Sequence, residues 1–304
     1  MIRTRSALAA ILALSALTDA ATPAHERIVK GDGIINATIT GVAGRIRIDP
    51  SGTAMPLVTT ASAERARLKS GMIGFGFDYA IGAEHVYGKT GVAQIDLGTG
   101  PFKHRIGWTA RAYTPTADGV VGPAGVPEDV VRFVLRAPII GERTVTLSMT
   151  DQGGLASGWG ERYAVIDLGG QPLRVRFDPY HARTLATASA AARIAAAQGG
   201  TLQGTVDMVE IAFGIERPVR TMTLARPLTV GPLQFATLGV RTADYGSTAG
   251  IADAAEPIDP DEIVITAKGK KSGRDRLSIG ADLLVRCSSI IFDKPAKQIR
   301  LTCD

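Results

Sequence analysis

The chain has 304 residues, 45% of them hydrophobic, and a formal net charge of +5 at pH 7. Its basic residues are scattered and form no block interleaved with aromatic side chains, so the composition argues against a nucleic-acid-binding protein. His25, His85 and His104 show no ligand spacing with each other or with carboxylates, and we expect no metal and no other cofactor.

Residues 1–24 resemble a secretory signal peptide. A basic start is followed by an apolar run at 6–17 and by small residues. The run is too short and wrongly flanked for a membrane span, and no later segment is long and apolar enough for one. We therefore expect a periplasmic or secreted protein without a membrane span. About 280 residues remain, which is enough for two lobes.

Two stretches of the mature chain are nearly identical in pattern. Residues 45–50 read RIRIDP and residues 174–179 read RVRFDP, and each stretch is followed at a similar distance by the letters TASA. This predicts an internal duplication. We expect an N-terminal lobe at 25–151, a glycine-rich linker at 152–162 and a C-terminal lobe at 163–304.

Short alternating runs separated by Gly and Pro predict a mainly β protein. A helix is expected at 189–198, with Ser189 as its N-cap, and a counterpart at 62–69. The glycine-rich region 71–91, with Tyr79 and Tyr87, predicts either a flap-like hairpin or an ordinary surface hairpin. The clearest strands are expected at 34–40, 45–48, 130–135, 144–149, 164–168, 173–177, 206–213 and 219–224.

An insertion is expected in the second lobe at about 246–276, because that stretch begins acidic and proline-bearing and ends basic. Within it, residues 261–267 (DEIVITA) resemble the TonB box, an extended strip that pairs with a strand of a TonB-like partner. A hairpin of the second lobe is the favoured alternative.

The two cysteines, Cys287 and Cys303, flank an expected closing hairpin. If Phe292 pairs with Gln298, the cysteines face each other directly and can form a cross-strand disulfide. Such a bond persists in an exported protein.

The order of these features is a strand ending in aspartate, a short helix, a hairpin, an apolar pair with glycine, and a closing hairpin. It resembles the retropepsin-like and pepsin-like aspartic peptidases. The resemblance implies two duplicated acid-protease-like β-barrel lobes with short helices, related by a pseudo-twofold axis. It also implies that Asp49 and Asp178 form a catalytic dyad at the lobe interface, beneath a flap, in a cleft for extended peptide or unfolded protein. The residues expected to support the cleft are Pro50, Ser51, Gly52, Gly122, Pro179, Tyr180, His181 and Gly280.

The aspartate loops depart from the family pattern of Asp, then Thr or Ser, then Gly. Proline follows both aspartates here, and it has neither a hydroxyl nor a backbone N–H. Three hypotheses therefore stay open: an active aspartic endopeptidase, an inactive pseudoprotease that binds peptide or protein, and an exported β protein whose Asp-Pro pairs merely begin turns. Arg47 and Arg176 alternate with apolar residues, so we expect both to point to solvent. Ion pairing of these arginines with the aspartates is the less favoured alternative.

Overall fold

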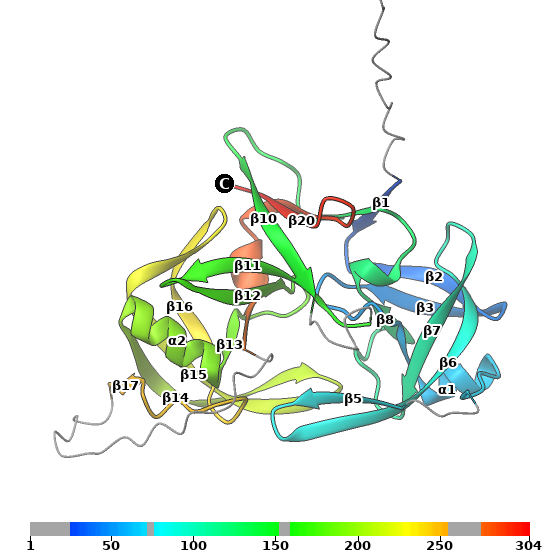
Figure 1. Cartoon of the computed structure of the whole chain (residues 1–304), viewed down its shortest axis with the longest axis horizontal. Helices are drawn as coiled ribbons and strands as arrows, with labels where there is room; N and C mark the ends of the chain where they lie inside the picture. The colour runs from blue at the N-terminus through cyan, green and yellow to red at the C-terminus, as the bar shows by residue number, and fades with distance from the viewer. Residues whose placement is uncertain (1–24, 72–75, 152–158, 255–274) are drawn as a thin grey trace, which may run out of the picture.

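The computed structural model describes residues 25–71, 76–151, 159–254 and 275–304 (Figure 1). The expected signal peptide at 1–24 and the TonB-box-like segment at 261–267 lie outside these residues, as do most of the expected linker and most of the expected insertion. None of the helices within the described ranges is long and apolar enough to cross a membrane.

The described chain is mainly β, as the alternating sequence predicts, and its helices are short. The helical elements are α1 (Thr60–Arg65), a 3-10 turn (Pro123–Gly125), α2 (Ala188–Gln198) and α3 (Ala281–Leu284). The strands are β1 (Glu26–Lys30), β2 (Ile34–Ile39), β3 (Val42–Ile48), β4 (Leu57–Thr59), β5 (Gly76–Ile81), β6 (Glu84–Asp96), β7 (Pro101–Thr109), β8 (Gly119–Val121), β9 (Val130–Val134), β10 (Arg143–Asp151), β11 (Arg162–Leu168), β12 (Gln171–Phe177), β13 (Leu185–Thr187), β14 (Gly200–Ala212), β15 (Ile215–Val230), β16 (Leu233–Arg241), β17 (Ala252–Asp253), β18 (Arg276–Ile279), β19 (Cys287–Asp293) and β20 (Gln298–Cys303).

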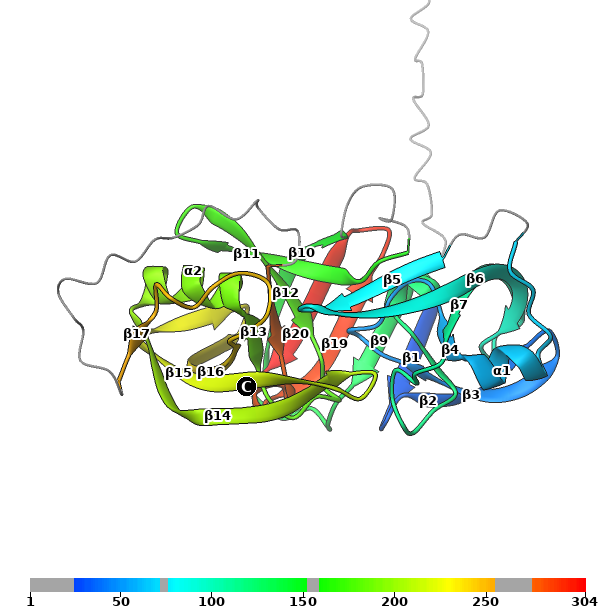
Figure 2. The same ribbon diagram turned by 90° about the horizontal axis from the view of Figure 1, so that it is seen from below.

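The first half forms a seven-stranded sheet in the order β2-β3-β8-β4-β7-β6-β5. Strand β2 also pairs with β6, so six of these strands close into a barrel and β5 stays outside it. The barrel is filled by alternating apolar side chains such as Ile46, Ile48, Ile95 and Ile106, which are buried. Closure leaves the β5–β6 hairpin projecting toward the second half (Figure 2).

The second half belongs to a 13-stranded sheet, and its segment β11-β12-β18-β13-β16-β15-β14 repeats the connectivity of the first sheet strand for strand. The strand leading to each aspartate, β3 or β12, pairs in parallel with a short strand, β8 or β18. That short strand pairs antiparallel with the strand before the helix, β4 or β13. Each aspartate-bearing strand is therefore fixed on the same side by the same kind of neighbour.

The two halves are joined by strands β1, β9, β19, β20 and β10, which lie next to one another at one end of the large sheet (Figure 2). The closing hairpin β19–β20 inserts between β9 and β10, which come from the end of the first half. Phe133 and Phe292 meet edge to face in this region, with ring centroids 5.9 Å apart. Because sequence-distant strands share one buried core here, the halves are held together.

The helices start earlier than the sequence predicts. The N-cap of α2 is Thr187, the last residue of β13, and Ser189 donates its hydroxyl to Asp275 instead. In α1 the cap is Thr59, whose hydroxyl accepts from the Ser62 N–H at 3.2 Å. The expected stop of α2 is confirmed, since Gly199 takes a left-handed conformation with φ of 75°.

The predicted disulfide between Cys287 and Cys303 is confirmed. The predicted register is wrong by one residue, because Phe292 pairs with Ile299 rather than with Gln298. An irregularity at Ser288 restores the direct opposition of the cysteines at the far end of the hairpin. A β-bulge inserts one residue into one strand, which alternation in the sequence does not reveal.

The disulfide is expected to stabilise the closing hairpin. It links residues 16 positions apart, and replacing both cysteines with serine should lower the free energy of unfolding by about 2–3 kcal/mol. Urea denaturation of the oxidised protein and of the double variant measures this difference. Equal midpoints and slopes for the two proteins would contradict the expectation.

Candidate active site

Asp49 and Asp178 occupy matching places at the ends of β3 and β12. The Asp49 N–H donates to the Val121 carbonyl at 2.9 Å, and the Asp178 N–H donates to the Ile279 carbonyl at 2.8 Å. Both aspartates then begin a turn, closed by an N–H three residues on, from Gly52 at 2.9 Å or from His181 at 3.1 Å. Both side chains are buried, so the loops present two desolvated carboxyl groups.

Gly122 and Gly280 let the neighbouring chain approach each aspartate loop from behind. A Cβ on Gly122 would lie 2.0 Å from the Gly52 carbonyl oxygen, and a Cβ on Gly280 would lie 2.5 Å from the Arg183 carbonyl oxygen. A Cβ therefore does not fit at either position, and glycine is required there.

The two carboxyl groups line one cavity of about 350 Å³. Of the residues expected at the cleft, the structure places Ser51, Tyr180 and His181 on this cavity with Asp49 and Asp178. The others, Pro50, Gly52, Gly122, Pro179 and Gly280, lie in or against the loops and do not line it.

The two aspartates have different partners. Asp49 Oδ1 accepts hydrogen bonds from the Ser51 N–H and from the Ser51 hydroxyl, both at 2.8 Å. Asp178 Oδ2 lies 3.6 Å from Arg176 Nη2. Burial, together with the negative charge of Asp178, raises the pKa of Asp49 to about 7, although the Ser51 hydrogen bonds and the charge of Arg176 oppose the rise. The pair is therefore asymmetric in its surroundings.

The expectation that Arg176 points to solvent is wrong, because its side chain is only 4% exposed. Its Nε donates to the Ser278 hydroxyl at 2.6 Å, and its Nη1 pairs with Glu161 Oε1 at 3.2 Å. Strand β12 lies between β11 and β18 inside the sheet, and neighbouring segments cover both of its faces. Alternation puts a side chain on the opposite face of a strand, and that face is not always exposed.

The Arg47 side chain is expected from the sequence to point to solvent, but the structure places it at the cavity that Asp49 and Asp178 line. Its guanidinium lies over the Tyr180 ring, 4.7 Å from the centroid. The Tyr180 hydroxyl in turn packs against Gly33, where a Cβ would be 2.4 Å from it. These contacts link the second aspartate loop to the first half.

Glu161 is the residue that the sequence did not reveal. It lies at the end of the expected linker, is 2% exposed, and accepts from four donors. Oε1 accepts from Tyr79 at 2.8 Å and from Arg176 at 3.2 Å, and Oε2 accepts from Tyr163 and, at 3.0 Å, from Arg276. Burial alone would raise the pKa of Glu161, but the charges of Arg276 and Arg176 and the tyrosine hydrogen bonds lower it to about 2.

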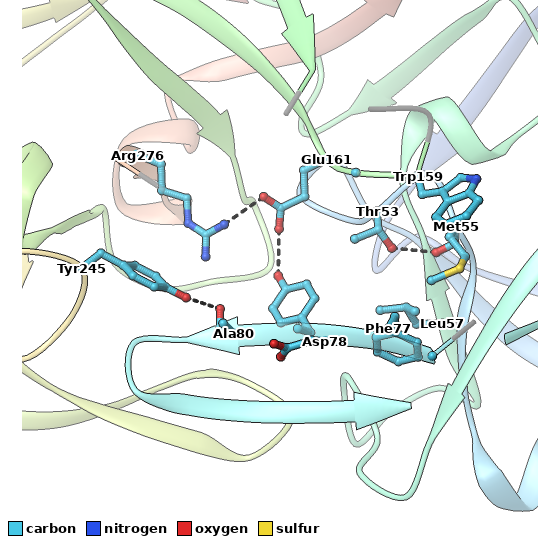
Figure 3. A pocket seen from close by; sticks show the side chains of 13 residues that line it. Thr53, Met55, Leu57, Phe77, Asp78, Ala80, Trp159, Glu161, Tyr245 and Arg276 are labelled. Carbon is cyan, nitrogen blue, oxygen red and sulfur yellow. Dashed lines mark hydrogen bonds and ion pairs between the residues drawn. The ribbon is translucent and has the colours of Figure 1, made fainter. Parts of the chain in front are cut away.

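A second cavity, of about 330 Å³, lies between β5 and the chain that leads into β11 (Figure 3). Met55, Leu57, Phe77 and Trp159 form its apolar wall, and the ion pair of Glu161 with Arg276 closes its other end (Figure 3). Arg276, the last residue of the expected insertion, is in fact a buried residue of β18. The cavity combines a large apolar surface with a few fixed polar groups, as ligand sites commonly do.

The β5–β6 hairpin contributes residues 76–80 to the wall of the apolar cavity. It meets the β14–β15 hairpin of the second half (Figure 2). Phe213 at the tip of β14–β15 packs against Tyr79 and Tyr113, with ring centroids 5.2 and 5.1 Å apart. The Tyr245 hydroxyl donates to the Ala80 carbonyl. Tyr87, the other aromatic residue of the expected flap, is 71% exposed and takes no part in the site.

His181 connects the second aspartate loop to β14. Its Nδ1 lies 2.8 Å from the Arg183 carbonyl oxygen and its Nε2 lies 3.0 Å from the Glu210 carbonyl oxygen.

Within the described ranges, no three His, Cys, Asp or Glu side chains come together in a way that could hold a metal ion. A search against protein-family models and a search of curated proteins both find no match to this chain.

Proposed function

We propose that the protein is an exported aspartic-peptidase-like hydrolase in which Asp49 and Asp178 cleave a peptide bond. The observation that carries the proposal is that two buried carboxyl groups at matching loop positions line one cavity. Their interaction, after burial itself, raises the pKa of Asp49 to about 7. Two close carboxyl groups that do not both ionise hold the single proton that this chemistry needs.

The repeated strand order supports the duplication and the two acid-protease-like lobes that form part of this proposal. So do the matching parallel pairs β3–β8 and β12–β18, and the glycines that follow β8 and β18. A pseudo-twofold axis between the lobes would bring the two aspartate loops face to face.

The different surroundings of the two carboxyl groups assign their roles. Asp178, paired with Arg176, is the carboxylate that accepts a proton from the attacking water. Asp49 is the acid that donates its proton to the scissile carbonyl oxygen as the water oxygen bonds to the carbonyl carbon. The tetrahedral intermediate then collapses: one of its hydroxyl groups returns a proton to Asp49 as the C–N bond breaks, and the proton held by Asp178 passes to the leaving amine nitrogen.

The substrate class is extended peptide or unfolded protein. The β5–β6 hairpin acts as the flap, since it borders the apolar cavity and its Tyr79 reaches the ionic groups behind the dyad. Export to the periplasm or beyond fits the signal-like residues 1–24 and the disulfide between Cys287 and Cys303.

The alternative function is a pseudoprotease that binds peptide without cutting it. The ion pair of Arg176 with Asp178 favours this alternative, because the cation lies against the carboxylate that would have to accept a proton from the attacking water. Pro50 and Pro179, in place of the hydroxyl residues of the family, favour it as well.

Cleavage of an unfolded protein between pH 4 and pH 8 separates the two functions. A peptidase is expected to be blocked by a statine-type inhibitor and to lose about a thousandfold in rate with Asp178→Asn. The exposed Asp129→Asn is the matched control and should cleave like the wild type. Absence of cleavage, with peptide binding that survives both Asp49→Asn and Asp178→Asn, would identify the binding module instead.

A further inference from the structure

Three groups form a continuous line from the β5–β6 hairpin to the dyad. The Tyr79 hydroxyl of β5 donates to Glu161 Oε1 at 2.8 Å, and the same oxygen accepts from Arg176 Nη1 at 3.2 Å. Arg176 Nη2 lies 3.6 Å from Asp178 Oδ2. Tyr79 and Arg176 therefore share one carboxylate oxygen, and Arg176 divides its charge between Glu161 and Asp178.

The two carboxylate oxygens of Glu161 accept hydrogen bonds from different partners. Oε2 serves Tyr163 and Arg276, neither of which is shown in contact with an aspartate of the dyad. Only the Oε1 side carries a contact with the hairpin and a contact with the dyad's cation. Both side chains are buried, since Glu161 is 2% and Arg176 is 4% exposed. Water therefore does not screen the attraction between their charges.

From this geometry we infer that Glu161 is a positioning residue, which ties closure of the β5–β6 hairpin to the charge around the dyad through Arg176. This inference rests on the proposed function of Asp49 and Asp178. When the hairpin is closed, the Tyr79 hydroxyl donates a hydrogen bond to Glu161 Oε1. This weakens the attraction of that oxygen for Arg176, so that Arg176 can move closer to Asp178. When the hairpin opens, Glu161 loses that donor and draws Arg176 away from the dyad.

Other groups face the dyad and must remain constant in any test. Among the described residues they are Arg47 of β3 and Tyr113 from the first half, and Tyr180, His181, Arg183 and Glu210 from the second. Glu161 accepts its hydrogen bonds from Tyr79, Arg176, Tyr163 and Arg276, and none of the groups named above is among these donors. A change at Tyr79 therefore reaches the dyad through Glu161 and Arg176 or through direct packing against Tyr113.

The test follows the Asp49 carboxyl by carbon-detected NMR titration in the full mature chain, which needs no enzymatic activity. Removing the Tyr79 hydroxyl draws Arg176 toward Glu161, so Tyr79→Phe should raise the pKa of Asp49 by about half a pH unit or more. Tyr163→Phe is the matched control, because it removes one phenol from the same carboxylate on its other oxygen. It should leave the Asp49 titration nearly unchanged.

Arg176→Met completes a double-mutant cycle. Arg176→Met alone should raise the pKa of Asp49. Adding Tyr79→Phe to Arg176→Met should cause no further change in this pKa, because the cation that connects Glu161 to the dyad is absent. Equal shifts from Tyr79→Phe and Tyr163→Phe, no shift from Tyr79→Phe, or a Tyr79→Phe shift that persists without Arg176 would each overturn the inference. An Asp49 that titrates near 4 in the wild type would instead refute the dyad itself.

Discussion

Replacing Glu161 with glutamine is expected to lower the free energy of unfolding near pH 7 by about 3–5 kcal/mol, the usual cost of removing one partner from a buried ion pair. The substitution leaves the side chains of Arg176 and Arg276 buried without their shared counterion. Two tyrosine hydroxyls, from Tyr79 and Tyr163, also lose a charged acceptor. Urea denaturation followed by tryptophan fluorescence measures the difference.

The pH dependence of this loss has a definite sign. The pKa of Glu161 falls from 4.5 to about 2 on folding, so its ionised form contributes stability above pH 4.5. That contribution disappears as the pH falls from 4.5 toward 2, and it amounts to about 3 kcal/mol at 1.36 kcal/mol per pH unit. The difference in the free energy of unfolding between the wild type and Glu161→Gln should therefore be smaller at pH 3 than at pH 7. The exposed Glu64→Gln serves as the control, and a gap below about 1 kcal/mol at pH 7 would contradict the account.

Asp49→Asn is expected to act in the opposite direction and to stabilise the protein at pH 8. The pKa of Asp49 rises from 3.8 to about 7 on folding, so the folded chain holds this proton more tightly than the unfolded chain. Stability is then lost as the pH rises from 4 to 7, by up to about 4 kcal/mol. Asparagine carries no charge at any of these pH values, and its Oδ1 can still accept from Ser51.

The gain from Asp49→Asn should vanish at pH 4, where the folded wild type is protonated at this position. Paired denaturation curves of wild type and variant at pH 4 and pH 8 measure the change, with Asp129→Asn as the exposed control. A variant that is less stable than the wild type at pH 8 would show that the Asp49 carboxylate is a structural ion and not a group held ready for chemistry.

Local sequence patterns were enough to find much of the fold. Alternation located β2, β3 and β9 to within a few residues, and the repeated Asp-Pro stretches located the two loops that line one cavity. The bulge at Ser288 and the early start of α2 were missed, because pairing with neighbouring strands decides them. Local propensity is overridden by tertiary contacts at such places.

The ionic part of the site could not be found in the same way. Glu161 lies beside a glycine-rich stretch, and Arg276 lies at the end of a polar stretch, so both read as surface residues. Their burial depends on the pairing of β11 with β12 and of β12 with β18, which no local pattern encodes. Arg176 is the clearest example. Its alternation with apolar residues correctly predicted a strand, but the expectation that its side chain is exposed was wrong.

The central claim is that Asp49 and Asp178 form one interacting pair. An NMR titration of the Asp49 carboxyl in the wild type and in Asp178→Asn tests it most directly. The account predicts a transition near pH 7 in the wild type, and a fall of about one pH unit or more in the variant, once the neighbouring charge is gone. An Asp49 transition that is the same in both proteins would contradict the pairing.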